Sequence, residues 1–235
     1  MTTDRAALAA LSGEIVACRR CPRLVEWRER VAVEKVARFR DETYWGRPLP
    51  GFGDPDARVL LLGLAPAAHG GNRTGRVFTG DASGDFLWAR LFEAGLADRP
   101  SSRRADDGLT LTDTYIAAAV RCAPPANKPT TDERDACAPF LVRELSLLES
   151  VRVVVALGQF GWDAALRAFG ELEHAVVPRP RFRHLAEARV GPYTLLGSYH
   201  PSQQNTFTGR LTPAMFDAVL ERARAVATGS RPTSG

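Results

Sequence analysis

Four cysteines are the residues of this sequence whose type and spacing point most directly to chemistry. Cys18 and Cys21 form a C-x2-C pair, and Cys122 and Cys137 follow much later in the chain with C-x14-C spacing. Zinc and iron–sulfur clusters both accept four thiolates, so residue type alone leaves this choice open. The long gap between the pairs favours a cluster over a compact zinc ribbon, and unliganded core cysteines are the third alternative.

A glycine-rich stretch, residues 63–84, holds the second set of candidate groups. It has no Lys and therefore cannot be a phosphate-binding P-loop, and it lacks the G-x-G-x-x-G pattern of dinucleotide sites. What remains is one aromatic side chain, Phe78, and one carboxylate, Asp81, three residues apart. By themselves, Phe78 is also compatible with a core position, and Asp81 with a cap of the helix that begins near Gly84.

Strands and helices alternate along the chain and must position these groups. Apolar runs that end in turn residues predict buried strands at 58–64, 114–120, 151–158 and 194–199. Helical periodicity predicts helices at 4–38, 85–96, 131–149, 158–169 and 212–227. The alternation predicts a three-layer α/β/α fold with a central, mostly parallel four-stranded sheet. The segments 63–81, 122–131 and 200–211 each follow a strand, at the edge where open parallel sheets bind ligands.

Length and composition are those of a globular chain. The 235 residues are 45% hydrophobic and 25% charged, which excludes a disordered, collagen-like or coiled-coil protein. No apolar window approaches the roughly 18 residues of a membrane span, and the N-terminus lacks the features of a secretory signal, so a cytoplasmic protein is expected. The net charge of +4, with 29 Arg and 2 Lys, permits a polyanionic partner without establishing one. We expect one domain over residues 1–227 and a flexible tail over 228–235.

Three segments and the cysteines together resemble one family. GLAPAAHGGNRTGRVFTGDASG, residues 63–84, resembles the first motif of uracil-DNA glycosylases, closest to type B, the fifth family. HPSQQNTFTGRLT, residues 200–212, is similar to that family's histidine motif and the loop that follows it. RCAPPANKPT, residues 121–130, resembles the segment that carries a base-reading Asn. The cysteine pattern is similar to the four-iron–four-sulfur ligand set of the fourth and fifth families.

The resemblance implies a fold, a cofactor and a ligand set. It implies a uracil-DNA glycosylase-like fold and a 4Fe-4S cluster that ties the N-terminal helical segment into a single glycosylase domain. The implied cluster ligands are Cys18, Cys21, Cys122 and Cys137. With its ligands far in sequence from Asp81, the cluster is expected to be structural.

The resemblance also implies roles for individual residues. Phe78 would stack on an extruded uracil, and Asn127 would read its edge, because an amide carries both a donor and an acceptor. His200 would hydrogen-bond the uracil anion as it forms. Asp81 would orient water or stabilise the sugar cation, because Leu64 and Ala65 stand where other families carry a polar group.

Further contacts are implied around these groups. Gly63 and Ala65 would line the base pocket, and His69 is a weaker candidate for catalysis. The segment after His200 would enter the duplex and contact DNA through Gln203, Gln204, Asn205 and Arg210. Arg73, Arg76 and Arg210 are candidate phosphate contacts, which would position the protein without reading sequence.

The expected function is removal of uracil, and of other deaminated or modified bases, from DNA. The enzyme is expected to be monofunctional, because Lys35 and Lys128, the only lysines, lie outside the main loop and leave no evident Schiff-base nucleophile. It is expected to act as a monomer on double-stranded, and also single-stranded, DNA in the nucleoid. The alternatives are a non-catalytic iron–sulfur module that binds DNA and a zinc-stabilised hydrolase of nucleosides.

Overall fold

The structure is a computed structural model, in which residues 4–229 are described. These residues form one six-stranded sheet with the strand order β1-β3-β2-β4-β6-β5. Its four inner strands are parallel, and β1 and β5 add to the edges in the antiparallel direction. The strands are β1 (Phe52–Gly53), β2 (Val59–Gly63), β3 (Thr114–Ala118), β4 (Val153–Leu157), β5 (Glu187–Val190) and β6 (Tyr193–Ser198).

The predicted four-stranded parallel sheet is confirmed as the centre of this larger sheet. Every residue of β2, β3 and β4 is buried, as expected for strands covered on both faces. The two edge strands were not predicted. Strand β1 is two residues long within a Gly- and Pro-rich loop, and β5 is half exposed with charged residues, so neither carries an apolar signal.

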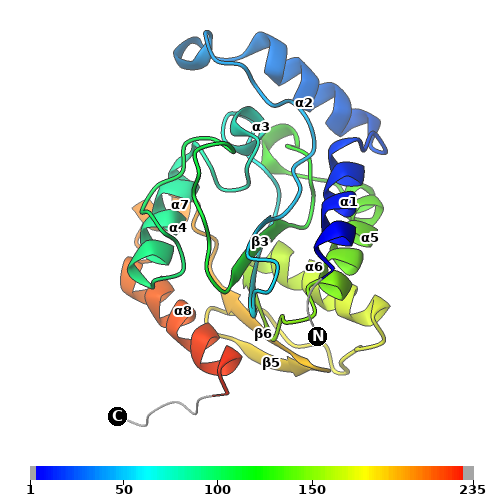
Figure 1. Cartoon of the computed structure of the whole chain (residues 1–235), viewed down its shortest axis with the longest axis vertical. Helices are drawn as coiled ribbons and strands as arrows, with labels where there is room; N and C mark the ends of the chain where they lie inside the picture. Colours follow the sequence, from blue (N-terminus) through cyan, green and yellow to red (C-terminus); the bar gives the residue numbers. More distant parts are fainter. Residues whose placement is uncertain (1–3, 230–235) are drawn as a thin grey trace.

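Helices cover the sheet on both faces, so the predicted three-layer architecture is confirmed (Figure 1). Alternate strand residues point to opposite faces: Val59 and Leu61 pack with α4 and α8, whereas Leu60 and Leu62 pack with α1, α5 and α6. These helices are α1 (Arg5–Val16), α4 (Ala82–Glu93), α5 (Thr131–Leu147), α6 (Gln159–Glu171) and α8 (Pro213–Ala227).

The N-terminal segment differs from its prediction in one respect. The single helix expected at 4–38 is two helices, α1 and α2 (Pro22–Glu34), followed by the short η1 (Ala37–Phe39). The chain breaks where Cys21 becomes the N-cap of α2 and Pro22 takes its first position, which suits proline because that position needs no N–H donor. Two ion pairs, Glu14–Arg143 and Arg23–Glu133, fasten this segment to α5.

Two segments that were predicted to be loops contain short helices. They are α3 (Gly71–Thr74) in the glycine-rich stretch and α7 (Gln203–Phe207) after His200, and the η2 turn (Pro125–Asn127) lies in the middle loop. The predicted tail at 228–235 lies outside the described residues from position 230 onward. None of the helices in the described part of the chain is both long enough and apolar enough to span a membrane.

We expect Trp88→Ala to be among the most destabilising substitutions in the core. Trp88 is fully buried on α4, and its indole N–H donates a 2.6 Å hydrogen bond to the Phe78 carbonyl. Truncation of such a side chain costs about 3–5 kcal/mol of unfolding free energy. Phe92→Ala on the same helix is the control, because Phe92 is 41% exposed, and it should change stability by only about 0.5 kcal/mol. Urea unfolding of both variants measures the difference, and equal losses would contradict this packing.

Candidate functional site

A cavity of about 590 Å³ opens at the carboxyl ends of the parallel strands. Its size lies within the roughly 300–1,000 Å³ typical of small-molecule sites. The loops after β2, β3 and β6 supply its walls, so the three segments expected to gather at this edge of the sheet do meet at one cavity. Eight of the residues singled out from sequence line it: Gly63, Ala65, Phe78, Asp81, Asn127, His200, Gln203 and Gln204. Pro66 and Ser202 also line it; they were not singled out, although both lie within the two long motifs.

Phe78 lies over the end of β2 because two glycines leave room for it. A Cβ on Gly63 would come within 2.7 Å of the Phe78 ring, and one on Gly84 within 1.9 Å of its carbonyl oxygen. Phe78 itself has a φ of 51°, which is costly for a bulky residue and is held by the hydrogen bond from Trp88. The ring packs on the core and also lines the cavity, so the core alternative and the pocket alternative are both realised.

His200 follows β6, and its ring lies 5.8 Å from that of Phe78, centroid to centroid. Burial lowers the pKa of the imidazole to about 4, so the ring is neutral at physiological pH. The Asn205 side chain donates a 2.8 Å hydrogen bond to the His200 carbonyl. Asn205 therefore braces the histidine turn and is not among the residues that line the cavity.

Asp81 combines the two roles considered for it. As N-cap of α4, its Oδ1 accepts a 3.0 Å hydrogen bond from the Gly84 N–H, and the residue also lines the cavity. Its Oδ2 lies against Gly70, where an added Cβ would come within 2.1 Å of it. Burial raises the pKa of the carboxyl above the ordinary 3.8, whereas the N–H groups of Gly84 and Ser83 lower it. These N–H donors favour the ionised carboxylate.

Asn127 approaches the cavity from the exposed η2 turn. It has a φ of 55°, and the preceding Ala126 also lies in the left-handed region, at 53°. The Asn127 amide makes no side-chain hydrogen bond within residues 4–229, so both its donor and its acceptor are available at the cavity wall. An exposed amide with these properties can pair with a ligand.

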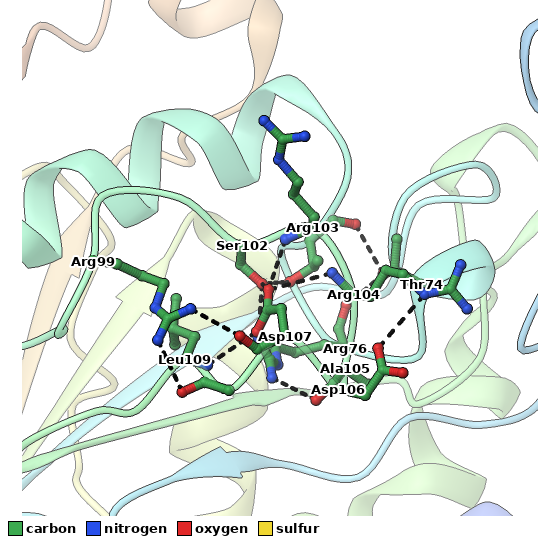
Figure 2. A network of polar contacts seen from close by, with 12 residues as sticks. Thr74, Arg76, Arg99, Ser102, Arg103, Arg104, Ala105, Asp106, Asp107 and Leu109 are labelled. Atoms are coloured by element: carbon green, nitrogen blue, oxygen red, sulfur yellow. Dashed lines mark hydrogen bonds and ion pairs between the residues drawn. The ribbon is translucent and has the colours of Figure 1, made fainter.

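The prediction that Arg73 and Arg76 contact phosphate is wrong. Both are buried, at 7% and 4% exposure, and both are ion-paired. The Arg76 guanidinium binds Asp107 and Ser102, and Figure 2 shows Asp107 at the centre of the polar network that joins these side chains. These partners could not be predicted from the sequence, because Asp107 lies 31 residues from Arg76.

Two other predicted residues lie away from the cavity lining. Arg210 is exposed and stacks over the Tyr199 ring, 4.7 Å from its centroid, which leaves it available to a partner at the surface. His69 accepts or donates a 3.1 Å hydrogen bond with the Tyr44 hydroxyl, and it does not line the cavity.

The four cysteines lie around one small pocket, although they come from distant parts of the sequence. Cys18 and Cys21 stand at the break between α1 and α2, Cys122 follows β3, and Cys137 lies within α5. Burial raises the pKa of the Cys21 and Cys137 thiols and raises that of Cys122 to about 12. Within residues 4–229, no group of three or more His, Cys, Asp or Glu is arranged to hold a single metal ion.

Donors to the cysteine sulfurs are already in place. The buried Arg28 guanidinium donates a 2.9 Å hydrogen bond to Cys122 Sγ, and the Arg121 N–H donates a 3.4 Å hydrogen bond to Cys137 Sγ. A guanidinium beside a thiol favours the thiolate, which is the form that binds metal. The four thiols around one pocket, with these donors, therefore fit a cluster bound through four separate thiolates, such as an iron–sulfur cluster.

Comparisons with known proteins place this chain in a family. Residues 50–224 match the profile of the Uracil DNA glycosylase superfamily. A type-5 uracil-DNA glycosylase of Thermus thermophilus is 57% identical over 91% of this chain and 95% of its own length. A type-5 uracil-DNA glycosylase of Mycobacterium leprae is 53% identical over 92% of this chain and 94% of its own length. A type-4 uracil-DNA glycosylase of Archaeoglobus fulgidus is 30% identical over 66% of this chain and 70% of its own length.

The α/β/α fold and the match over most of its length make this chain a member of the uracil-DNA glycosylase superfamily. The higher identity and longer coverage place it in one branch of that superfamily. The chain belongs to the type-5 uracil-DNA glycosylases, which confirms the family resemblance seen in the sequence.

The protonation state of His200 can be measured directly. We expect its ring resonances in an NMR pH titration to change with a midpoint near pH 4, because burial disfavours the imidazolium. The unfolded chain binds this proton at about pH 6.5. The folded state should therefore lose stability as the pH falls from the unfolded value toward the folded one. His200→Gln should remove this part of the pH dependence of urea unfolding, and a His200 midpoint near that of a free imidazole would contradict the burial.

Proposed function

We propose that this protein is a monofunctional DNA glycosylase that hydrolyses the N-glycosidic bond of uracil in DNA and leaves an abasic site. Membership of the type-5 family supports the activity. The observation that carries the proposal is that a carboxylate, Asp81, and a neutral imidazole, His200, line the same cavity from loops far apart in the chain. We further propose that the described helices and sheet act as a single domain.

The base must leave the duplex before it can reach this cavity. Extrusion costs a few kcal/mol of stacking and pairing, and stacking on an aromatic face returns roughly 1–3 kcal/mol per base. Phe78 offers such a face in the cavity wall. Asn127, whose amide is unengaged, would pair with a carbonyl and the N–H of the uracil edge.

Cleavage places positive charge on the sugar and negative charge on the departing uracil. His200 is neutral and can donate one hydrogen bond to the uracil oxygen that gains charge. Asp81, favoured in its ionised form by N–H donors of α4, can orient a water molecule or stabilise the sugar cation. The two groups therefore act on opposite ends of the same bond.

We propose that the cavity also accepts other deaminated or modified bases. Leu64 and Ala65 line it where other glycosylases carry a polar group, so this part of the wall does not select one pattern of hydrogen bonds. Neither Lys35 nor Lys128 lines the cavity, which supports hydrolysis by water without a Schiff base.

The DNA-contacting surface that we propose is α7 and the residues beside it. Gln203 and Gln204 are exposed and line the cavity, and Phe207, also on α7, is 77% exposed. These side chains would fill the gap left by the extruded base, and Arg210 would meet the phosphate backbone. The proposed substrate is double-stranded and also single-stranded DNA of the nucleoid in the cytoplasm, bound by a monomer.

We propose that Cys18, Cys21, Cys122 and Cys137 hold a 4Fe-4S cluster. Support comes from their position around one pocket and from the hydrogen bond that Arg28 donates to Cys122. A cluster there supplies a structural crosslink between the α1–α2 break, the loop after β3 and α5. Arg28 would partly neutralise the charge of the thiolates.

Substitution of Asp81 tests the catalytic assignment. We expect Asp81→Asn to lower the single-turnover rate of uracil release by at least about 100-fold, because general acid–base groups contribute roughly 10²–10⁴. In the wild type, the rate should fall at acidic pH with a midpoint above the ordinary aspartate value of 3.8. Alkali cleavage of a uracil-containing duplex measures both. Asp98→Asn, an exposed aspartate, is the control, and undiminished release by Asp81→Asn would remove Asp81 from the mechanism.

The visible spectrum tests the cofactor. Aerobically purified protein should be brown and absorb in the visible range, and Cys137→Ser should lose that absorption and unfold at lower urea concentration. Iron and sulfide analysis separates the alternatives, because a colourless wild type that contains zinc would contradict the cluster.

DNA binding without release of any base would instead favour a non-catalytic module.

A further inference from the structure

Arg73 is a buried cation in the glycine-rich turn, and the proposed reaction gives it no role. A buried guanidinium is costly unless every nitrogen finds a partner. Each one does: Nη1 pairs with Glu42 at 2.5 Å, Nε donates to the His69 carbonyl at 2.8 Å, and Nη2 donates to the Gly80 carbonyl at 3.1 Å. One planar group thus joins three separate points of the chain.

Two of these points are the ends of the turn that surrounds the Asp81 carboxylate. His69 precedes Gly70, whose backbone lies against Asp81 Oδ2, and Gly80 directly precedes Asp81. A Cβ on Gly80 would come within 2.4 Å of Arg73 Nη2, and its φ of 81° favours glycine. The sequence of the turn therefore leaves room for the guanidinium as well as for the carboxylate.

The outer side of Arg73 is held by residues outside the motif. The Phe39 ring lies 3.8 Å from Arg73 Cζ in a cation–π arrangement, and Glu42 closes the ion pair. Both partners belong to the segment that follows α2. These contacts hold the guanidinium to a second segment of the chain, so its two carbonyl bonds constrain the turn.

We propose that Arg73 is the positioning residue of Asp81: its guanidinium holds both ends of the 69–80 turn and so keeps the carboxylate between Gly70 and the first turn of α4. The inference rests on the proposed function, in which Asp81 acts at the sugar. Arg73 itself contacts neither the base nor the sugar, and its effect on the reaction is exerted only through Asp81.

Arg73 also acts on Asp81 electrostatically. Its positive charge lowers the pKa of the Asp81 carboxyl, against burial and the neighbouring Asp85, which raise it. Other ionisable groups line the two hollows that share Asp81: Arg38, Glu42, Arg103 and Arg104 on one side and His200 on the other. Loss of the Arg73 charge should therefore reduce the ionised fraction of Asp81 at acidic pH.

The test is the pH profile of single-turnover uracil release, measured from the neutral plateau down through the whole acid limb. In Arg73→Gln, the acid-side midpoint should rise, because a charge that lowers the pKa of Asp81 is lost, and the maximal rate should fall by about tenfold or more because the carboxylate is misplaced. Arg73→Lys should keep the midpoint near that of the wild type but lose rate, since one ammonium cannot reproduce the fork that binds two carbonyls.

Arg76→Gln is the matched control. Arg76 is a buried, ion-paired arginine of the same turn, but its partners are Asp107, Ser102 and the Ala105 carbonyl. Its loss should lower the urea midpoint of unfolding and leave the pH midpoint of the reaction unchanged. A general weakening of the turn is thereby separated from an effect on Asp81.

A double-mutant comparison completes the test. Adding Arg73→Gln to Asp81→Asn should cause no further loss of rate, because a residue that acts through Asp81 has nothing left to position. An unchanged pH midpoint in Arg73→Gln, or a further loss in the double variant, would overturn the inference and leave the proposed function standing. If Arg73→Gln does not fold, Arg73→Lys takes its place in the test. A rate of uracil release in Arg73→Lys equal to that of the wild type would then overturn the inference. A rate in Asp81→Asn equal to the wild type would instead remove Asp81 from the mechanism, and only a wild-type protein that releases no uracil would defeat the proposed function itself.

Discussion

The packing of one carboxylate into a space that only glycine leaves open is the constraint on which the site depends. Gly70 and Gly84 leave space for Asp81 and for the Phe78 carbonyl, and added Cβ atoms would come within 2.1 Å and 1.9 Å of them. A carboxylate out of water must have hydrogen bonds or a countercharge. The α4 N-terminus and Arg73 supply these, which explains why so much of the turn is buried and polar at once.

The cavity places this charge opposite a group of different character. His200 carries no fixed charge because burial holds its pKa near 4. It follows β6, whereas Asp81 lies in the loop after β2, so the two residues reach the cavity from opposite sides of β4. The sheet itself makes this possible, since β2 and β6 both end at the same edge with β4 between them. Loops that are far apart in the chain thus meet at one cavity, where the Phe78 and His200 rings lie 5.8 Å apart.

Much of this arrangement could be predicted from the sequence, and the exceptions have a physical reason. The buried strands, the edge at which the loops gather and eight lining residues follow from apolar runs and short motifs. Strands β1 and β5 escape notice because pairing with β3 and β6, not hydrophobic patterning, stabilises them. The helix α7 escapes notice because it has only five residues, none of them buried. Arg73 and Arg76 were misassigned as surface groups because the acids that bury them, Glu42 and Asp107, lie 31 residues away in each case.

The attachment of α1 to α5 has a consequence for how the chain is made. Glu14 and Arg143 are separated by 129 residues, and α1 packs on a helix that ends at Leu147. During synthesis the first helices leave the ribosome long before the surface that covers them exists. The apolar side of the N-terminal segment therefore stays exposed until more than half of the protein has been synthesised, and during this time it is open to non-native contacts.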